Sequence, residues 1–231
     1  MRIVMISGAS RGIGLAIARE LAKRGHALSL GVRKPAAVPQ DVREAVGGCL
    51  VETYDAADRS AHKRWIKSTL DRYGRIDTLV NNAGIAPKIT LEEGTDEALD
   101  EIFEINVKGP FRLIQAALPH LKAAGQGRVV NVASLSGKRV SNLNVGYQMS
   151  KHALVALTHA VRRVGFEHGI RATALCPGFV ATDLTADVVD MPRAQMIDAA
   201  DLAVLAATLI ELPNNASVAE LLVSCRYEHT M

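Results

Sequence analysis

Residues 3–24 read IVMISGASRGIGLAIARELAKR, and this stretch decides the expected fold class. An apolar run at residues 3–7 leads into a glycine-rich turn at residues 8–14. Apolar side chains then recur three and four positions apart, as in a helix that lies on a sheet. Backbone N–H groups of such a turn can approach a phosphate, and the dipole of the following helix attracts negative charge. The stretch therefore predicts a strand, a phosphate-binding turn and a helix.

Strand and helix patterns alternate along the rest of the chain. Most of the strand candidates are nearly continuous apolar runs, which is typical of parallel strands covered on both faces. The predicted strands are residues 3–7, 27–32, 50–53, 78–81, 128–133, 171–175 and 218–223. The predicted helices are residues 13–24, 60–73, 97–106, 111–123, 147–168 and 199–212, with Ser60 and Thr95 as N-caps. This alternation predicts an α/β fold with a doubly wound parallel sheet of the Rossmann type.

Composition excludes several other classes of protein. The 231 residues are 48% hydrophobic without a linker-like stretch, so we expect one domain over residues 1–231. The net charge is +3, the basic residues are scattered and aromatics make up 4%, which argues against nucleic-acid binding. The three cysteines and seven histidines match no metal-ligand spacing, so no metal site is expected. No apolar run suits a secretory signal or a membrane span, so a cytoplasmic protein without membrane contact is expected.

Two arginines bear on the choice of nicotinamide cofactor. Dinucleotide folds place an acidic residue after the second strand to hold the ribose 2′-hydroxyl of NAD, or an arginine nearby to hold the 2′-phosphate of NADP. Here Arg33 follows the second predicted strand and Arg11 lies in the glycine-rich turn. Arginine can bind a phosphate with two hydrogen bonds, so NADP(H) is expected in preference to NAD(H). Ordinary surface cations are the alternative interpretation.

A tyrosine and a lysine share one face of the predicted helix 147–168. Tyr147 and Lys151 are four residues apart, so their side chains can converge on one site. The unperturbed pKa of tyrosine is ~10, and a neighbouring ammonium group lowers it, which makes Tyr147 a candidate acid and base. Ser134 follows the predicted strand 128–133, at the edge of a parallel sheet where ligands bind.

Taken together, these motifs are too specific in order and spacing to be independent. The chain resembles the short-chain dehydrogenase/reductase family, in its single-domain branch. The matching landmarks are the turn at residues 8–14, the sequence NNAG at residues 81–84, Asn106, the set Ser134, Tyr147 and Lys151, and Pro177-Gly178 with Thr182. The resemblance spans residues 7–182 and implies an NAD(P)-dependent oxidoreductase that interconverts carbonyl and alcohol groups.

The resemblance also implies a role for each catalytic residue. Tyr147 would give a proton to the nascent alkoxide during carbonyl reduction, and Ser134 would hydrogen-bond the substrate oxygen. Lys151 would bind the nicotinamide ribose and lower the pKa of Tyr147. Asn106 would hold a water molecule of a proton relay. The implied cofactor-binding residues are Gly8, Ser10, Arg11, Gly12, Ile13, Gly14, Arg33, Asp55, Asn82, Ala83, Gly84, Tyr147, Lys151, Pro177, Gly178, Val180 and Thr182.

The chain departs from the family pattern at several points. Ser7 stands where the family usually has threonine, and its hydroxyl can serve the same hydrogen bonds. The stretch between Thr182 and Ala199 is short for a substrate lid, which favours an open pocket. Lys138 and Arg139 would favour an anionic substrate, or they are exposed loop cations. The C-terminal part lacks the family's frequent glycine pair, so a homodimer through helices 111–123 and 147–168 is expected rather than a tetramer.

The expected function is reduction of a ketone or aldehyde, a small-molecule substrate, by NADPH. A protein that binds NADP(H) as a sensor or scaffold, without turnover, is the alternative from another class, because a fold alone does not define a function. A serine hydrolase is a third candidate, since Gly8, Ser10 and Gly12 satisfy the pattern G-x-S-x-G. That hydrolase site needs an oxyanion loop from an earlier connection, and only seven residues precede Gly8.

Overall fold

Seven parallel strands form the centre of the molecule. The computed structural model describes residues 1–227, so the last four residues of the expected domain lie outside the described part. The strands form one sheet in the order β3-β2-β1-β4-β5-β6-β7, and every neighbouring pair is parallel. Their bounds are β1(Ile3–Ser7), β2(Ala27–Val32), β3(Cys49–Thr53), β4(Thr78–Asn81), β5(Arg128–Val132), β6(Arg171–Pro177) and β7(Glu220–Val223). The predicted α/β fold with a doubly wound parallel sheet is confirmed.

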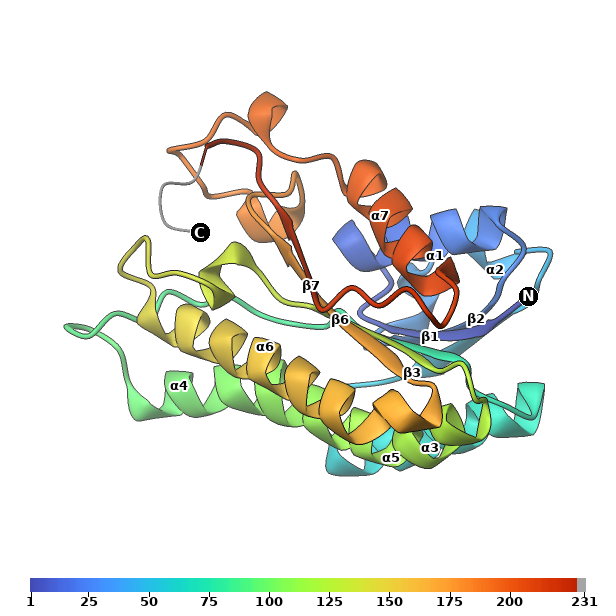
Figure 1. Ribbon diagram of the computed structural model, residues 1–231. Helices are drawn as coiled ribbons and strands as arrows, with labels where there is room; N and C mark the ends of the chain where they lie inside the picture. The colour runs from blue at the N-terminus through green and yellow to red at the C-terminus, as the bar shows by residue number, and fades with distance from the viewer. Residues whose placement is uncertain (228–231) are drawn as a thin grey trace.

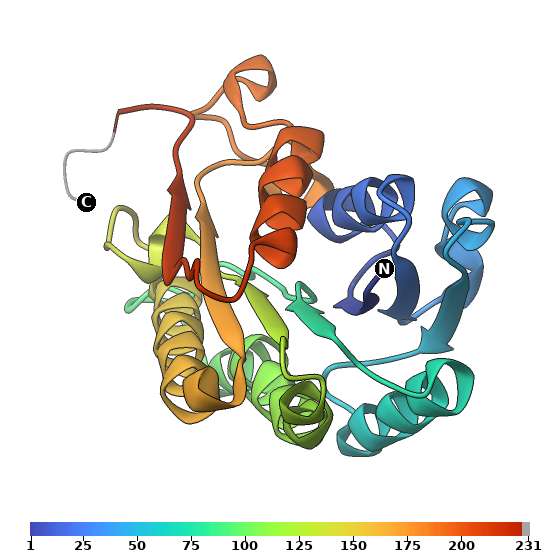
Figure 2. The ribbon, with the colours of Figure 1, turned by 45° about the vertical axis from the view of Figure 1, so that its right-hand side comes forward.

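Helices cover both faces of this sheet (Figures 1 and 2). One face carries α1(Gly12–Lys23), α2(Gln40–Arg43) and α7(Ala199–Glu211). The other carries α3(Arg59–Tyr73), α4(Asp96–Phe103), α5(Gly109–Ala123) and α6(Val145–Gly165). The chain runs outward in opposite directions from β1 and β4, and a crevice at the carboxyl ends of the strands at such a point is where open α/β sheets bind ligands.

The apolar runs of the sequence become the two buried layers between sheet and helices. On one side Ile17 and Leu21 of α1 meet Leu202 and Ile210 of α7 over the strands. On the other side α3 and α5 bury apolar residues that include the fully covered Trp65. Strands β1, β2, β4 and β5 are buried along their whole length. Strands covered on both faces need apolar side chains on both, which explains why the sequence shows continuous runs rather than alternation.

Several predicted boundaries were wrong by a few residues. The N-cap of α3 is Asp58 and not Ser60, because the Asp58 carboxylate accepts the backbone N–H of Ser60 at 2.8 Å and the helix begins at Arg59. Thr95 is confirmed as the N-cap of α4. Helix α6 begins at Val145, two residues before the predicted start, and ends at Gly165 before a 3-10 turn. The predicted helix 97–106 ends earlier, and Asn106 lies in the π-helical turn Glu104–Lys108 between α4 and α5.

The remaining differences concern the ends of strands and one short helix. Strand β6 continues to Pro177, β7 begins at Glu220 rather than residue 218, and the sequence did not predict α2. Within residues 1–227, no helix combines the length and apolar character that crossing a membrane requires.

Candidate active site

The glycine-rich turn joins β1 to α1 and leaves no room for a side chain at Gly8 or Gly14. Gly8 and Gly12 have φ values of 69° and 55°, in the left-handed region that favours glycine. A Cβ atom on Gly14 would lie 2.4 Å from Asn82 Nδ2 and 2.5 Å from the carbonyl oxygen of Gly8. The turn is therefore packed directly against the residues that follow β4.

Ser7 and Asn82 fasten this turn to the end of β4. Ser7 Oγ accepts the backbone N–H groups of Asn82 and Ala83 at 3.0 and 3.1 Å. In return, Asn82 Nδ2 donates to the carbonyl oxygens of Ser7 and Gly8, both at 3.0 Å. The Ser7 hydroxyl thus forms the bonds expected of it, and the amide of Asn82 supports the turn. Ser7 was not among the predicted site residues, although a hydroxyl directly before the first glycine was a visible signal.

The first turn of α1 can accept an anion. Within the described residues, no side chain caps this helix and its first turn contains no acidic residue. By contrast α3, α4, α6 and α7 each begin with a side chain that accepts a backbone N–H group. Uncapped N–H groups beside a glycine-lined turn suit a pyrophosphate, because they supply donors and the positive end of the helix dipole. The residues present therefore fit a dinucleotide.

The two predicted phosphate-binding arginines have different surroundings. The Arg11 guanidinium donates to the Asp183 carboxylate at 3.1 Å, and these two side chains are 69% and 67% exposed. Arg33 is exposed after β2. Asp55 follows β3, the neighbouring strand, and its carboxylate accepts the N–H of Ala57 at 3.0 Å. Arg33 and Asp55 therefore lie at adjacent strand ends, while Arg11 joins the turn to the segment after β6.

Ser134, Tyr147 and Lys151 are brought together at the carboxyl end of β5. Ser134 directly follows the strand, and its Oγ accepts the N–H of Ser136 at 3.1 Å and donates to the carbonyl oxygen of Pro177 at 3.5 Å. Ser134 is also near enough to the Tyr147 hydroxyl to act on the pKa of Tyr147. Tyr147 lies in the first turn of α6. One turn later, the amine of Lys151 lies 5.5 Å from the centroid of the Tyr147 ring and donates to the carbonyl oxygen of Val132 at 2.9 Å.

Burial shifts the pKa values of both titratable members of this cluster. It raises the pKa of Tyr147 to about 12, and the hydrogen bond from Ser134 opposes this shift. The expectation that the pKa of Tyr147 is lowered was wrong for this structure, because removal of the phenolate from water outweighs the stabilisation it receives. Burial lowers the pKa of Lys151 to about 8. At neutral pH Tyr147 therefore keeps its proton and can donate it.

Asn106 connects the end of β4 to α6. Its Oδ1 accepts the N–H of Ile85, and its Nδ2 donates to the carbonyl oxygen of the same residue, both at 2.9 Å. Nδ2 also donates to Ser150 Oγ at 3.1 Å, next to Lys151 in the sequence. The side chain is 1% exposed, so these bonds form away from water. Single π-helical turns often occur at functional sites, and this one places Asn106 against the strand end.

The segment after β6 closes the other side of the site. Gly178 N–H donates to the carbonyl oxygen of Val223 at 2.8 Å, which continues the pairing of β6 with β7 beyond Pro177. Val180 pairs with Ile197 in an isolated bridge. A Cβ atom on Gly12 would lie 3.4 Å from the methyl group of Thr182. The segment thus passes beside the glycine-rich turn. This closeness is required if the segment and the turn bind the same cofactor, as the sequence predicts.

Lys138 does not supply a free cation to a substrate. Its amine lies 2.7 Å from the carboxylate of Glu220 on β7, which also contacts His159 at 2.7 Å. The expectation that Lys138 favours an anionic substrate is therefore not supported. The side chain of Arg139 hydrogen-bonds the hydroxyl of Ser141.

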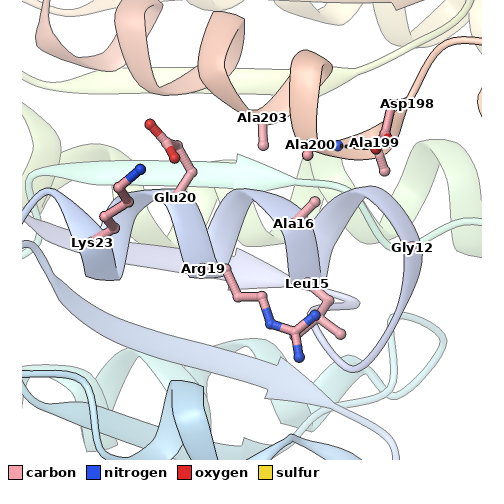
Figure 3. Close-up of a pocket in the computed structure, with 10 residues that line it drawn as sticks. All are labelled: Gly12, Leu15, Ala16, Arg19, Glu20, Lys23, Asp198, Ala199, Ala200 and Ala203. Carbon is pink, nitrogen blue, oxygen red and sulfur yellow. Dashed lines mark hydrogen bonds between the residues drawn. The ribbon is translucent and has the colours of Figure 1, made fainter.

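A groove between α1 and α7 lies behind the glycine-rich turn (Figure 3). Gly12 is the only predicted site residue in its lining, which also includes Leu15 and Arg19 of α1 and Ala203 of α7. Asp198, at its rim, accepts the N–H of Ala200 at 2.8 Å. The groove therefore does not coincide with the cluster around Tyr147. In the described part of the chain no group of three or more histidine, cysteine, aspartate or glutamate side chains could hold a metal ion.

Comparison with known proteins identifies the family of the chain. Residues 2–193 match the family model described as short chain dehydrogenase. The chain is 40% identical to an agropine synthesis reductase of Rhizobium rhizogenes over 98% of its own length and 53% of that protein, so it spans about half the length of that relative.

Two solved structures have the same fold. An alcohol dehydrogenase from the archaeon Thermococcus sibiricus, in complex with 5-hydroxy-NADP, is 30% identical, with a TM-score of 0.88 and 96% coverage of both chains. A 3-ketoacyl-(acyl-carrier-protein) reductase from Brucella melitensis, in complex with NADH, is 26% identical, with a TM-score of 0.88 and the same coverage. On the match of the family model and the geometry of the site, the chain belongs to the short-chain dehydrogenase/reductase family.

Proposed function

We propose that this protein is an NADPH-dependent reductase of ketones or aldehydes, and that residues 1–231 form one domain with both the cofactor site and the catalytic site. The observation that carries the proposal is the convergence of Ser134, Tyr147 and Lys151 at the carboxyl end of β5, in a sheet whose β1 leads into an uncapped, glycine-lined helix terminus. A protein that only binds a nucleotide has no chemical need for this cluster of three side chains.

The cofactor is proposed to lie across the carboxyl ends of β1, β4 and β5. The N–H groups at the start of α1 hold its pyrophosphate, and Arg33 and Arg11 hold the 2′-phosphate of NADPH. Lys151 donates to the nicotinamide ribose, while Val180 and Thr182 contact the carboxamide. When bound, the reduced nicotinamide supplies a hydride. The relative solved with 5-hydroxy-NADP supports NADP(H), and the relative solved with NADH keeps NAD(H) as the alternative.

The protein's own residues are proposed to manage the proton. Tyr147 gives its phenolic proton to the carbonyl oxygen of the substrate, and the raised pKa of Tyr147 keeps that proton in place at neutral pH until it is needed. Ser134 hydrogen-bonds the same oxygen and so orients the carbonyl. The phenolate that remains is reprotonated by Lys151, and Asn106 holds a water molecule through which Lys151 regains its own proton from solvent. A positioned acid of this kind accelerates a reaction by typically ~10²–10⁴-fold.

The segment between Thr182 and Ala199 is proposed to border an open substrate pocket. It contains only two short 3-10 turns, Asp183–Thr185 and Arg193–Gln195. Its Leu184 and Val189 are exposed and only its Met191 is buried, so most of the segment is not packed down as a closed lid. A small carbonyl compound is the substrate class that this arrangement supports best.

The experiment is to follow NADPH oxidation with a panel of aldehydes, ketones and dicarbonyls, with NADH in parallel. Tyr147→Phe removes the proton donor. Tyr73→Phe is the matched control, because Tyr73 is the last residue of α3 and its hydroxyl donates to the carbonyl oxygen of Leu28 on β2. We expect turnover that Tyr147→Phe abolishes and Tyr73→Phe preserves. Tight NADPH binding without turnover of any carbonyl would favour the sensor or scaffold instead.

A further inference from the structure

One carboxamide at the start of α6 joins three backbone groups from two parts of the chain. Asn144 Oδ1 accepts the N–H of Tyr147 at 3.4 Å, as an N-cap does. The same oxygen accepts the N–H of Ile89 at 3.1 Å, and Nδ2 donates to the carbonyl oxygen of Pro87 at 3.0 Å. The side chain thus pairs with residues 87–89 through both a donor and an acceptor, as a neighbouring strand would.

The backbone and the apolar side chains reinforce this pairing. Gly146 N–H donates to the carbonyl oxygen of Ile89 at 3.3 Å. The Ile89 side chain is 4% exposed, and a Cβ atom on Gly146 would lie 2.7 Å from its Cδ1 atom. The first turn of α6 therefore touches residues 87–89 closely enough that only glycine fits at position 146.

The segment held by Asn144 begins at the predicted cofactor site. Residues 85–89 directly follow Asn82, Ala83 and Gly84. Ser7, at the start of the glycine-rich turn, accepts the N–H groups of Asn82 and Ala83. Asn106 holds the segment at Ile85, and Asn144 holds it at Ile89. Residues 82–90 belong to no strand, so side-chain amides supply the hydrogen bonds that a neighbouring strand would otherwise make.

We propose that Asn144 is a positioning residue for the reaction, an inference that rests on the proposed function. By fastening the first turn of α6 to residues 85–89, it sets where the Tyr147 hydroxyl lies relative to Ser134 and to the substrate carbonyl. Capping alone does not explain the residue, because serine or aspartate caps a helix about as well as asparagine. A carboxamide carries its acceptor and its donor on two separate atoms, so one short side chain reaches the N–H of Ile89 and the carbonyl oxygen of Pro87 at once, which the single oxygen of a hydroxyl does not.

The variants separate capping from attachment of the segment. Asn144→Ser keeps a hydroxyl that can cap Tyr147 but is too short to hold both Pro87 and Ile89. Asn144→Asp keeps the acceptor and places a second acceptor against the carbonyl oxygen of Pro87. Thr95→Ala is the matched control, because it also removes a helix N-cap, and the 3.3 Å hydrogen bond that Thr95 accepts from Ala98 lies within the first turn of α4.

The measurements are kcat, KM for the carbonyl, Kd for NADPH and the melting temperature of each variant. We expect Asn144→Ser and Asn144→Asp to lose about 10- to 100-fold in kcat, since a displacement of about 1 Å at a reacting group costs up to ~10²-fold. KM and the Kd for NADPH should stay within about threefold of wild type, because the substrate and cofactor contacts remain. Thr95→Ala should keep the wild-type kcat.

Each other outcome overturns the inference. If either folded Asn144 variant has the kcat of wild type, Asn144 does not position Tyr147. If Thr95→Ala loses as much kcat as Asn144→Ser, the effect is general destabilisation. If Tyr147→Phe abolishes turnover while both Asn144 variants are normal, only the role of Asn144 fails. If wild type turns over no carbonyl, the proposed function fails, and the role of Asn144 fails with it.

Discussion

The amine of Lys151 lies 5.5 Å from the ring centroid of Tyr147 and donates to the backbone carbonyl of Val132 at 2.9 Å. The hydrogen bond joins a cation of α6 to the last residue of β5, two residues before Ser134. Lys151 is buried, and its burial lowers the pKa of its amine to about 8, from an ordinary value of 10.5. The shift makes the stability of the protein depend on pH in a direction that can be stated.

Between pH 8 and 10.5 the wild-type protein should become more stable relative to Lys151→Met as the pH rises. The unfolded lysine keeps its proton up to about 10.5, whereas the folded lysine loses it near 8, so the unfolded state binds more protons in this range. The relative gain in unfolding free energy is at most roughly 3 kcal/mol. Urea unfolding at a series of pH values measures it.

Lys63→Met, which changes an exposed lysine of α3, is the control for this series. Its unfolding free energy relative to wild type should not change between these pH values. If the difference in unfolding free energy between wild type and Lys151→Met does not change with pH either, the pKa of Lys151 is not lowered.

Arg33→Ala should weaken NADPH binding about tenfold and leave NADH binding nearly unchanged. A charge-assisted hydrogen bond contributes ~1.5–3 kcal/mol, and exposure of Arg33 places the expected effect at the lower end. Titration of the free protein with each cofactor gives both constants, and Arg72→Ala, an exposed cation late in α3, is the control. Equal losses for NADPH and NADH would mean that Arg33 does not contact the 2′-phosphate.

Asp183→Asn should strengthen NADPH binding by about two- to fivefold at low ionic strength. In the structure the Asp183 carboxylate forms an ion pair with the Arg11 guanidinium at 3.1 Å. Removal of the Asp183 charge leaves Arg11 free to bind the cofactor phosphate. An exposed ion pair is worth at most ~1 kcal/mol, and salt screens it, so the gain should disappear at high salt. Unchanged or weaker binding at low salt would contradict a role of Arg11 in holding the phosphate.

Val164→Asp should convert the protein to a monomer if α5 and α6 form the homodimer interface that the sequence led us to expect. Val164 on α6 and Phe111 on α5 are 52% and 50% exposed, and these two helices lie next to one another on the outer face of one layer (Figure 1). Val204→Asp, on α7 across the sheet, is the control, because Val204 is 44% exposed and should not change the assembly. Sedimentation velocity measures the assembly state, and a dimeric Val164→Asp would exclude α6 from the interface.

Most of the fold follows from local patterns in the sequence. Continuous apolar runs mark buried parallel strands, and the glycines of the turn at residues 8–14 occupy positions where a side chain would collide. The convergence of Ser134, Tyr147 and Lys151 follows from the strand end and the four-residue spacing. Helix caps are less predictable, because Asp58 and Ser60 are both good caps two residues apart, and local sequence does not choose between them.

The parts that could not be predicted depend on burial and on contacts between distant residues. The direction of the Tyr147 pKa shift depends on how completely the phenol is covered, which the sequence does not show. Lys138 is paired by Glu220, a residue of the edge strand β7 far along the chain. The same holds for Asn144, whose contacts with Pro87 and Ile89 exist only once the loop after β4 has folded back onto α6.

Transfer of deuterium from the nicotinamide to the substrate would show that the protein reduces a carbonyl by hydride transfer. NADPH labelled at the transferable C4 position is incubated with wild-type protein and the carbonyl compound that reacts fastest in the panel, and the alcohol is analysed by mass spectrometry. We expect one deuterium atom on the carbinol carbon of the product, and no labelled alcohol with Tyr147→Phe. An alcohol without deuterium, or equal labelling by Tyr147→Phe, would contradict hydride transfer assisted by Tyr147.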